Sequence, residues 1–302
     1  MKHNGANYEK IKDEIAEGTN VKAYYYGRTI EITNAINHQQ TSKVISGHKV
    51  VNLLTGEVSE MNTSATKRSD NLISIKRTMR RLRRLIGANF GSNGVDRQNQ
   101  LWITLTYAQD INATQSNSTQ QVYCDFKALM KKLRYHFGKL EYITVLEPQA
   151  SGRWHLHVLL KAPQKVNLYV PNTELERLWG KGFTSTKRLR NSDNVAGYVM
   201  AYVSNLDLTL THSSNKRSKK YIKGARLSLY PKGVRIYRRS KGIKDPKTRI
   251  DKKYMIIPEF ERENMPPPKV YVNQIKTKSG SVIRNVTEFY EKRANHPDQR
   301  ND

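Results

Sequence analysis

Cysteine is almost absent, since Cys124 is the only one in a chain of 302 residues. A single thiol excludes an internal disulfide framework and every zinc site that needs two or more thiolates. A metal site in this chain must therefore be built from histidine and carboxylate side chains.

Long apolar runs are absent too. No stretch approaches the roughly 18 to 20 apolar residues that a membrane-spanning helix needs. The first residues, MKHNGANYEKIKDE, lack the apolar core of a signal peptide. We therefore expect a soluble, intracellular protein that is not a membrane protein.

Acidic residues are scarce: 26 Asp and Glu stand against 53 Lys and Arg, a formal net charge of +27. With 37% hydrophobic and 9% aromatic residues, the chain can still bury a core, which a disordered polycation cannot do. The length fits one large domain or two small ones. A folded protein with this charge favours polyanionic partners, namely DNA, RNA or an anionic membrane face.

The basic residues are concentrated after the middle of the chain. Residues 213–254 hold 16 Lys and Arg against two Asp, which is about half of the excess charge. Within them, apolar and polar residues alternate in RLSLYPKGVRIYRRS around the turn signal Pro231-Lys232-Gly233. This pattern predicts a basic hairpin.

A second basic cluster, KRTMRRLRRL, carries six Lys and Arg residues. Apolar residues recur here at three- and four-residue spacing behind Ser69, a good N-cap, so the segment predicts an amphipathic helix. They are Leu72, Ile75, Met79, Leu82 and Ile86. The Arg-rich outer face, with Arg80 and Arg84, either contacts phosphate or is a solvated face on a packed helix.

The order of the predicted elements indicates an α+β fold with an antiparallel central sheet and flanking helices. Strands are predicted at KAYYYGRTIEIT, HKVVNLLTGEV, LWITLTY, LEYITVLE and RWHLHVLLKA, and helices at DFKALMKKLRYHF, about 175–179 and about 194–205. We expect an N-terminal accessory region at residues 1–95 and the central sheet with its basic hairpin extension at 96–245. Residues 246–302 are the expected polar, proline-containing C-terminal tail, and its composition from Ile257 onward predicts loose packing.

Two histidines, His155 and His157, lie two residues apart in the predicted strand WHLHVLL. Side chains two apart in a strand project to the same face, while Leu156 and Val158 point into the core. Neutral imidazoles are common metal ligands, and two of them with one carboxylate leave open positions on an ion for substrate oxygens.

Glu147 is the candidate carboxylate. It ends the preceding strand eight residues before His155, and a tight antiparallel hairpin would bring its side chain beside both imidazoles. The alternative is that Glu147 forms a surface ion pair.

Tyr198 and Tyr202 are spaced i and i+4 in NVAGYVMAYVSN. On a helix they share one face and can reach the same phosphate. Taken alone, the pair is better explained as two half-buried core rings.

In chain order, three segments resemble the ordered motifs of HUH endonucleases: LWITLTY, HLHVLL and GYVMAYV. In rolling-circle replication initiators (Rep proteins) the histidines precede the tyrosines, as they do here, whereas relaxases have the reverse order. The paired tyrosines resemble the two-tyrosine branch of bacterial plasmids, phages and integrative elements. The resemblance covers about residues 100–245. It implies an HUH/RRM-like palm and a location in the bacterial cytoplasm.

The resemblance implies that Glu147, His155 and His157 hold Mg²⁺ or Mn²⁺, and that Tyr198 or Tyr202 attacks a DNA phosphodiester. The product would be a covalent 5′-phosphotyrosine and a free 3′-OH, at a single-stranded or hairpin origin. A host helicase and a DNA polymerase are the further partners it implies.

One departure from the two-tyrosine pattern concerns lysines. The pattern often has a Lys before the second tyrosine and another three residues after it, where this chain has Ala201 and Asn205. The absence of these two lysines puts the role of the second tyrosine in question. Lys219, Lys220 and Lys223 are the candidates to take their place. Thr104 and Thr106 are expected beside the site in a supporting role.

Basic side chains near the site are expected to line the path of the DNA backbone, with aromatic rings stacking on bases. The candidates are Arg80, Arg84, Lys219, Lys220, Lys223, Arg226, Arg235, Arg238 and Arg239. Tyr221, Tyr230 and Tyr237 are either stacking residues or hairpin core. Residues 1–95 are a candidate for recognition of the double-stranded origin.

Two other functions stay open on these residues. A two-tyrosine HUH transposase would use the same chemistry at the ends of an element. A non-catalytic DNA- or RNA-binding protein would use the histidines and tyrosines as core or stacking residues.

Overall fold

The computed structural model describes residues 14–36, 42–61, 72–91, 98–108, 118–149, 153–163, 166–189, 229–231, 233–276 and 282–292. The chain divides into two compact units. The central unit is Thr63–Asp245, and the flanking unit combines Met1–Asn62 with Pro246–Asp302. Among the helices in the described ranges, none is long and apolar enough to cross a membrane.

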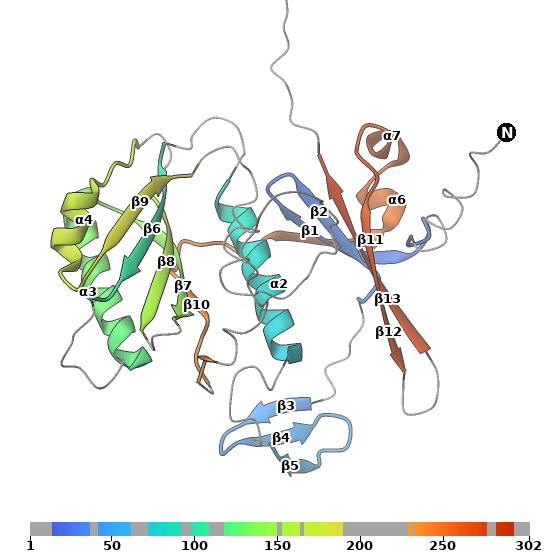
Figure 1. Ribbon diagram of the computed structural model, residues 1–302. Helices are drawn as coiled ribbons and strands as arrows, with labels where there is room; N and C mark the ends of the chain where they lie inside the picture. The colour runs from blue at the N-terminus through green and yellow to red at the C-terminus, as the bar shows by residue number, and fades with distance from the viewer. Residues whose placement is uncertain are drawn as a thin grey trace, which may run out of the picture. The chain divides into compact units, whose positions relative to one another are not determined.

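The central unit is built on a five-stranded sheet (Figure 1). Every pair of neighbouring strands is antiparallel, which confirms the predicted α+β class and antiparallel sheet. The strand order is β10 (Tyr237–Arg239), β7 (Glu141–Pro148), β8 (Trp154–Lys161), β6 (Gln100–Thr106) and β9 (Thr184–Arg188).

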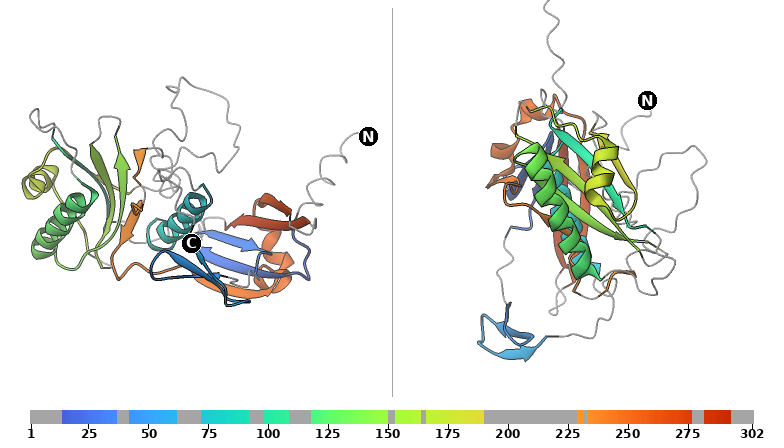
Figure 2. Two further views of the ribbon diagram at one scale, coloured as in Figure 1. Left: turned by 90° about the horizontal axis from the view of Figure 1, so that it is seen from below. Right: turned by 90° about the vertical axis from the view of Figure 1, so that its left-hand side faces the viewer.

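Helices lie on both sides of this sheet (Figure 2). On one side are α3 (Thr119–Phe137) and α4 (Asn172–Trp179), and on the other is α2 (Leu72–Asn89). The Ser118 side chain caps α3 by accepting from the backbone N–H of Gln121, and Phe126 meets Tyr142 of β7 edge-on at 4.9 Å.

The predicted amphipathic helix is confirmed as α2. Its apolar side chains Ile75, Met79, Leu82 and Ile86 are fully buried in the same core cluster as the sheet. The helix therefore belongs to the central unit, whereas the sequence placed it in an accessory region ending at residue 95. The reason is that this apolar stripe is buried against the central core.

The flanking unit holds a second five-stranded antiparallel sheet. Its strand order is β11 (Lys247–Lys252), β1 (Asn20–Tyr26), β2 (Thr29–Thr33), β13 (Val282–Glu291) and β12 (Lys269–Lys276). Two short helices, α6 (Lys253–Ile256) and α7 (Glu259–Arg262), belong to it, and α6 contributes to its core. A separate three-stranded sheet consists of β3 (Ser42–Ile45), β4 (Lys49–Asn52) and β5 (Val58–Glu60).

The expectation of a loosely packed tail is wrong for residues 269–276 and 282–291. These segments supply two of the five strands of the flanking sheet, β12 and β13, and β13 pairs directly with β2. The alternation in KVYVNQIK and VIRNVTEFYE suits strands with one buried face, and Tyr290 and Val286 are buried in the core. Without these strands β2 would have an open edge.

The predicted basic hairpin is also not what the described residues form. Tyr237–Arg239 pairs with β7, with Tyr237 opposite Val145, and so extends the central sheet. Tyr230 is buried and donates its hydroxyl to the Leu146 carbonyl. Tyr230 is therefore a core residue, which is one of the two roles predicted for it.

Candidate active site

The register of the central sheet brings the candidate metal ligands to one face. His155 lies opposite Glu147 on one side and Thr106 on the other. His157 lies opposite Val145 and Thr104. The shared face of the two histidines is as the sequence predicted, and Glu147 lies on that face in register with His155.

Glu147 and His157 contact each other directly. Their Oε2 and Nε2 atoms are 2.7 Å apart, and Glu147 is only 1% exposed. Burial at this level rules out a surface ion pair. A buried carboxylate is costly unless it is hydrogen-bonded, so the contact with His157 helps to hold Glu147 in place.

The second ring nitrogen of His157 faces a short polar chain. Thr104 Oγ1 lies 3.4 Å from His157 Nδ1, and the Trp102 indole N–H donates to the same hydroxyl at 3.2 Å. A neutral imidazole that donates from Nε2 to Glu147 leaves Nδ1 to accept from the Thr104 hydroxyl. This arrangement fixes the orientation of the His157 ring.

Both histidines are neutral near pH 7. Burial lowers the pKa of His157 to about 4. Burial, followed by the neighbouring His157 and Arg153, lowers the pKa of His155 to about 4. Neutral imidazole is the form that binds metal ions.

The donor set fits a divalent cation in chemistry, and imidazole ligands favour Mn²⁺ over Mg²⁺. The rings of His155 and His157 have centroids 6.5 Å apart. As the side chains stand, no group of three His, Cys, Asp or Glu residues within the described ranges is close enough to hold an ion. An ion held by all three side chains would therefore require them to move closer together.

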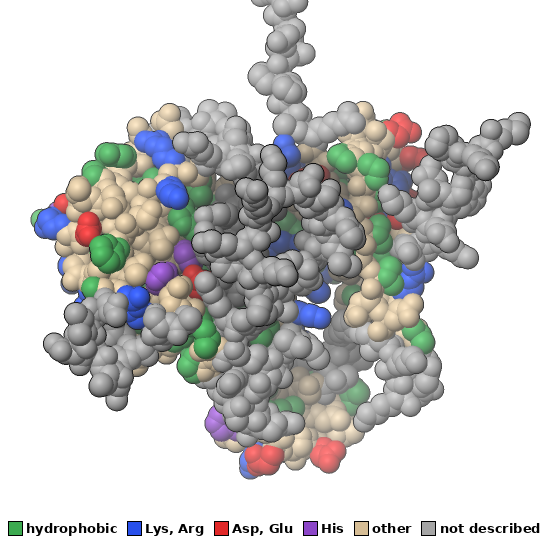
Figure 3. All heavy atoms as spheres, in the orientation of Figure 1, with side chains coloured by type: hydrophobic (Ala, Val, Ile, Leu, Met, Phe, Trp, Pro, Cys, Tyr) green, Lys and Arg blue, Asp and Glu red, His purple; other side chains and the backbone are tan. Residues whose placement is uncertain are grey.

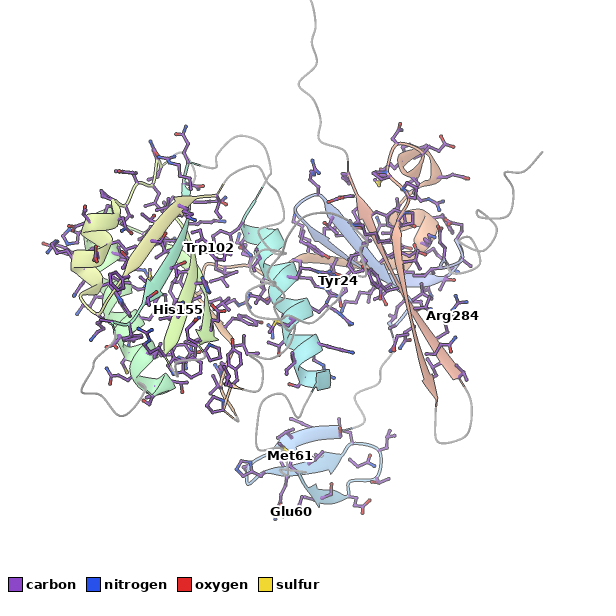
Figure 4. All side chains as sticks on the ribbon, in the orientation of Figure 1. Tyr24, Glu60, Met61, Trp102, His155 and Arg284 are labelled. Atoms are coloured by element: carbon purple, nitrogen blue, oxygen red, sulfur yellow. The ribbon has the colours of Figure 1, made fainter. Side chains whose placement is uncertain are left out.

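The histidine face reaches the molecular surface. Figure 3 shows histidine side chains beside an acidic one on the body formed by the central sheet. Figure 4 labels His155 and Trp102 on that sheet. The pair of Glu147 and His157 is buried, whereas His155 and Thr104 are partly exposed.

The candidate nucleophiles lie outside the described residues. This applies to Tyr198 and Tyr202 and equally to Lys219, Lys220, Lys223, Arg226 and Tyr221. Their predicted roles stay predictions.

The other arginines that were predicted to contact DNA differ in their exposure and in their contacts. Arg80 and Arg235 are exposed, and Arg84 is half-exposed. Arg238 lies over the ring of Tyr123, a residue of α3, at 3.4 Å. Arg239 is paired with Asp245 at 2.7 Å.

Trp102 and strand β9 are parts of this site that the sequence did not indicate. The TSTKR segment of β9 carries no apolar residue, so the alternation that marks a half-buried strand is missing. Only its two β-branched threonines favour a strand.

Residues 100–207 match the family of the replication-associated protein ORF2. Over this region the chain is similar to replication-associated proteins. The matched segment begins with β6 and extends past Tyr198 and Tyr202, and the similarity supports a role in DNA replication. No curated protein and no solved structure matches the chain.

Proposed function

We propose that this protein initiates rolling-circle DNA replication by nicking and rejoining one strand of its origin. The observation that carries the proposal is the buried contact of 2.7 Å between Glu147 and His157, with His155 opposite Glu147 on the same sheet face. This cluster lies in the segment that is similar to replication-associated proteins and precedes both candidate tyrosines.

Glu147, His155 and His157 would hold Mg²⁺ or Mn²⁺. When bound, the ion polarises the phosphoryl oxygens of the DNA and offsets the charge that develops on them. The protein supplies one carboxylate and two neutral imidazole rings. Thr104 lies beside Nδ1 of His157 and holds that ring in its orientation.

The strand is cut by a tyrosine, either Tyr198 or Tyr202. Its phenolic oxygen forms a bond to phosphorus, and the bond from phosphorus to the 3′ oxygen breaks. The phenol loses its proton during attack, because a group with a pKa near 10 is a weak nucleophile when neutral. The leaving 3′ oxygen takes up a proton, so the exchange consumes neither electrons nor a nucleotide cofactor.

The 5′-phosphotyrosine keeps the energy of the broken phosphodiester, so a returning 3′-OH or the other tyrosine can reseal the strand without ATP. The free 3′-OH is a primer for a polymerase. A target held as a single strand or hairpin fits this chemistry, and a helicase would supply further single strand. Ala201 and Asn205 stand where the two-tyrosine pattern often has lysines. The proposal therefore does not specify which tyrosine makes the first cut.

The test is a covalent adduct. Purified protein is incubated with Mn²⁺ and single-stranded oligonucleotides that tile the DNA around its own gene. We expect one tile to give an adduct that resists denaturing gel electrophoresis and that requires the metal. A Tyr198→Phe/Tyr202→Phe double variant should form none.

Tyr135→Phe is the matched control, because Tyr135 is an exposed tyrosine on α3 of the same unit. It should form as much adduct as wild type. No adduct from wild type on any tile, or an undiminished adduct from the double variant, contradicts the proposal. Mass spectrometry of the digested adduct identifies which tyrosine carries the DNA, and the position of the cut tile distinguishes an origin from an element end.

A further inference from the structure

An exposed aromatic ring lies at the edge of the histidine face. Phe183 directly precedes β9 and is 70% exposed. Its carbonyl accepts a hydrogen bond of 2.9 Å from the Thr106 N–H. The β6–β9 register, which pairs Leu105 with Thr184, therefore continues by one residue and places Phe183 opposite Thr106.

The alternation along β9 sets the side to which Phe183 points. The Thr184 hydroxyl lies 3.0 Å from the Asn172 side-chain oxygen at the start of α4, so Thr184 faces the side of the sheet that α4 covers. Phe183 and Ser185 therefore face the opposite side, which carries the histidines. One row across the sheet then reads Phe183, Thr106, His155 and Glu147.

The backbone beneath Phe183 is clamped to the end of β6. Gly182 has a φ of +145°, and a Cβ there would lie 2.3 Å from the backbone nitrogen of Ala108. Ala108 in turn donates to the Lys181 carbonyl at 2.8 Å. A ring on a fixed backbone loses little freedom when a ligand stacks on it.

One cation shares the face of the ring. Lys187 is exposed and lies on the same face as Phe183, four residues along the strand. Neighbouring strands are about 4.8 Å apart, so Phe183 is about 10 Å from His155, a span of one or two nucleotides. Isolated exposed apolar residues are common, but this one shares a row with the candidate catalytic side chains, and a lysine lies on the same face about 13 Å along the strand.

We propose that Phe183 stacks on a base of single-stranded DNA next to the phosphate that is cut, and that Lys187 contacts the backbone beyond it. The proposal rests on the proposed function for its choice of DNA as the ligand. Stacking on a ring tolerates every base. Phe183 would therefore hold the strand in place, and other residues would have to read the origin sequence.

The test measures binding without cutting. A fluorescent single-stranded oligonucleotide is titrated in EDTA, and its anisotropy gives the dissociation constant. Phe183→Ala should weaken binding on the order of 10-fold, because stacking on one aromatic ring has about this effect. Phe183→Trp should bind as tightly as wild type or more tightly.

Tyr135→Ala is the matched control, since Tyr135 is 86% exposed but belongs to α3, on the other side of the sheet. It should leave affinity within twofold of wild type. A set of oligonucleotides with 2-aminopurine at successive positions should show one position quenched by wild type and released in Phe183→Ala. Unchanged affinity and unchanged quenching in Phe183→Ala would overturn the inference.

The results distinguish a failure of this inference from a failure of the proposed function. If wild type forms no covalent adduct but Phe183→Ala still weakens binding and releases the quenched base, nicking fails and the stacking site stands. If adducts form normally and Phe183→Ala changes neither binding nor quenching, the stacking site fails and nicking stands.

Discussion

Replacing Glu147 by glutamine separates the candidate metal site from the fold. The amide keeps an oxygen that accepts from His157 Nε2, at the position of the present contact of 2.7 Å. It also removes a buried negative charge, which is itself costly to bury. We therefore expect the free energy of unfolding of Glu147→Gln to stay within about 1 kcal/mol of wild type.

Metal affinity should respond very differently. Glu147 is the one anionic member of the candidate ligand set, and losing even an indirect partner of a metal ligand lowers affinity by about 10- to 100-fold. We expect Glu147→Gln to weaken Mn²⁺ binding, measured by calorimetry, by at least about 100-fold. Glu147→Ala should add a loss of about 1–3 kcal/mol in stability, because the His157 N–H then loses this acceptor.

The matched control is Glu141→Gln at the other end of β7. Glu141 accepts from the Gly242 N–H and is not part of the histidine cluster. It should leave Mn²⁺ affinity unchanged. If Glu147→Gln binds Mn²⁺ within threefold of wild type, Glu147 is not a metal ligand and the reasoning is refuted.

Three further predictions concern neighbouring residues. Thr104→Val should lower Mn²⁺ affinity by about 10-fold by releasing the His157 ring, while Thr104→Ser restores it; equal affinity for all three proteins would argue against a positioning role. The pKa values of about 4 for His155 and His157 keep them neutral when folded, whereas the unfolded chain takes up protons below about 6.5. Stability should therefore fall between pH 6.5 and pH 4, on the order of 2 kcal/mol for the pair at pH 5, and urea denaturation of a His155→Asn/His157→Asn variant should lack this slope. Gly182→Ala should cost about 2 kcal/mol or more because its Cβ would meet backbone, while Gly180→Ala, in the left-handed helical region at a φ of +59° and with its nearest atom at 3.8 Å, should cost about 1 kcal/mol; thermal melts that rank them the other way would contradict the packing argument.

The candidate ligands could be predicted from the sequence because strand periodicity is strict. His155 and His157 share a face whatever the neighbouring strand does, and a one-residue slip in the hairpin would have sent Glu147 to the wrong side. The short connection between β7 and β8 left little room for such a slip.

Features that depend on distant pairing could not be predicted. The partner of β2 is β13, more than 250 residues along the chain, and no local pattern in TIEIT indicates it. Arg238 and Arg239 look equivalent in the sequence. Only the pairing of β10 with β7 places one over Tyr123 and the other beside Asp245.

The two ends of the chain build one sheet, with the central unit inserted between β2 and β11. A ribosome therefore completes all of Thr63–Asp245 before it makes β11 and β13, the two strands that lie beside β1 and β2 in the sheet. Domains generally fold as units during synthesis, so the nested unit can reach its fold while the outer one is still unfinished. Cutting the gene at residue 95 would damage both units at once, and the natural excision points are the two crossings near residues 62 and 246.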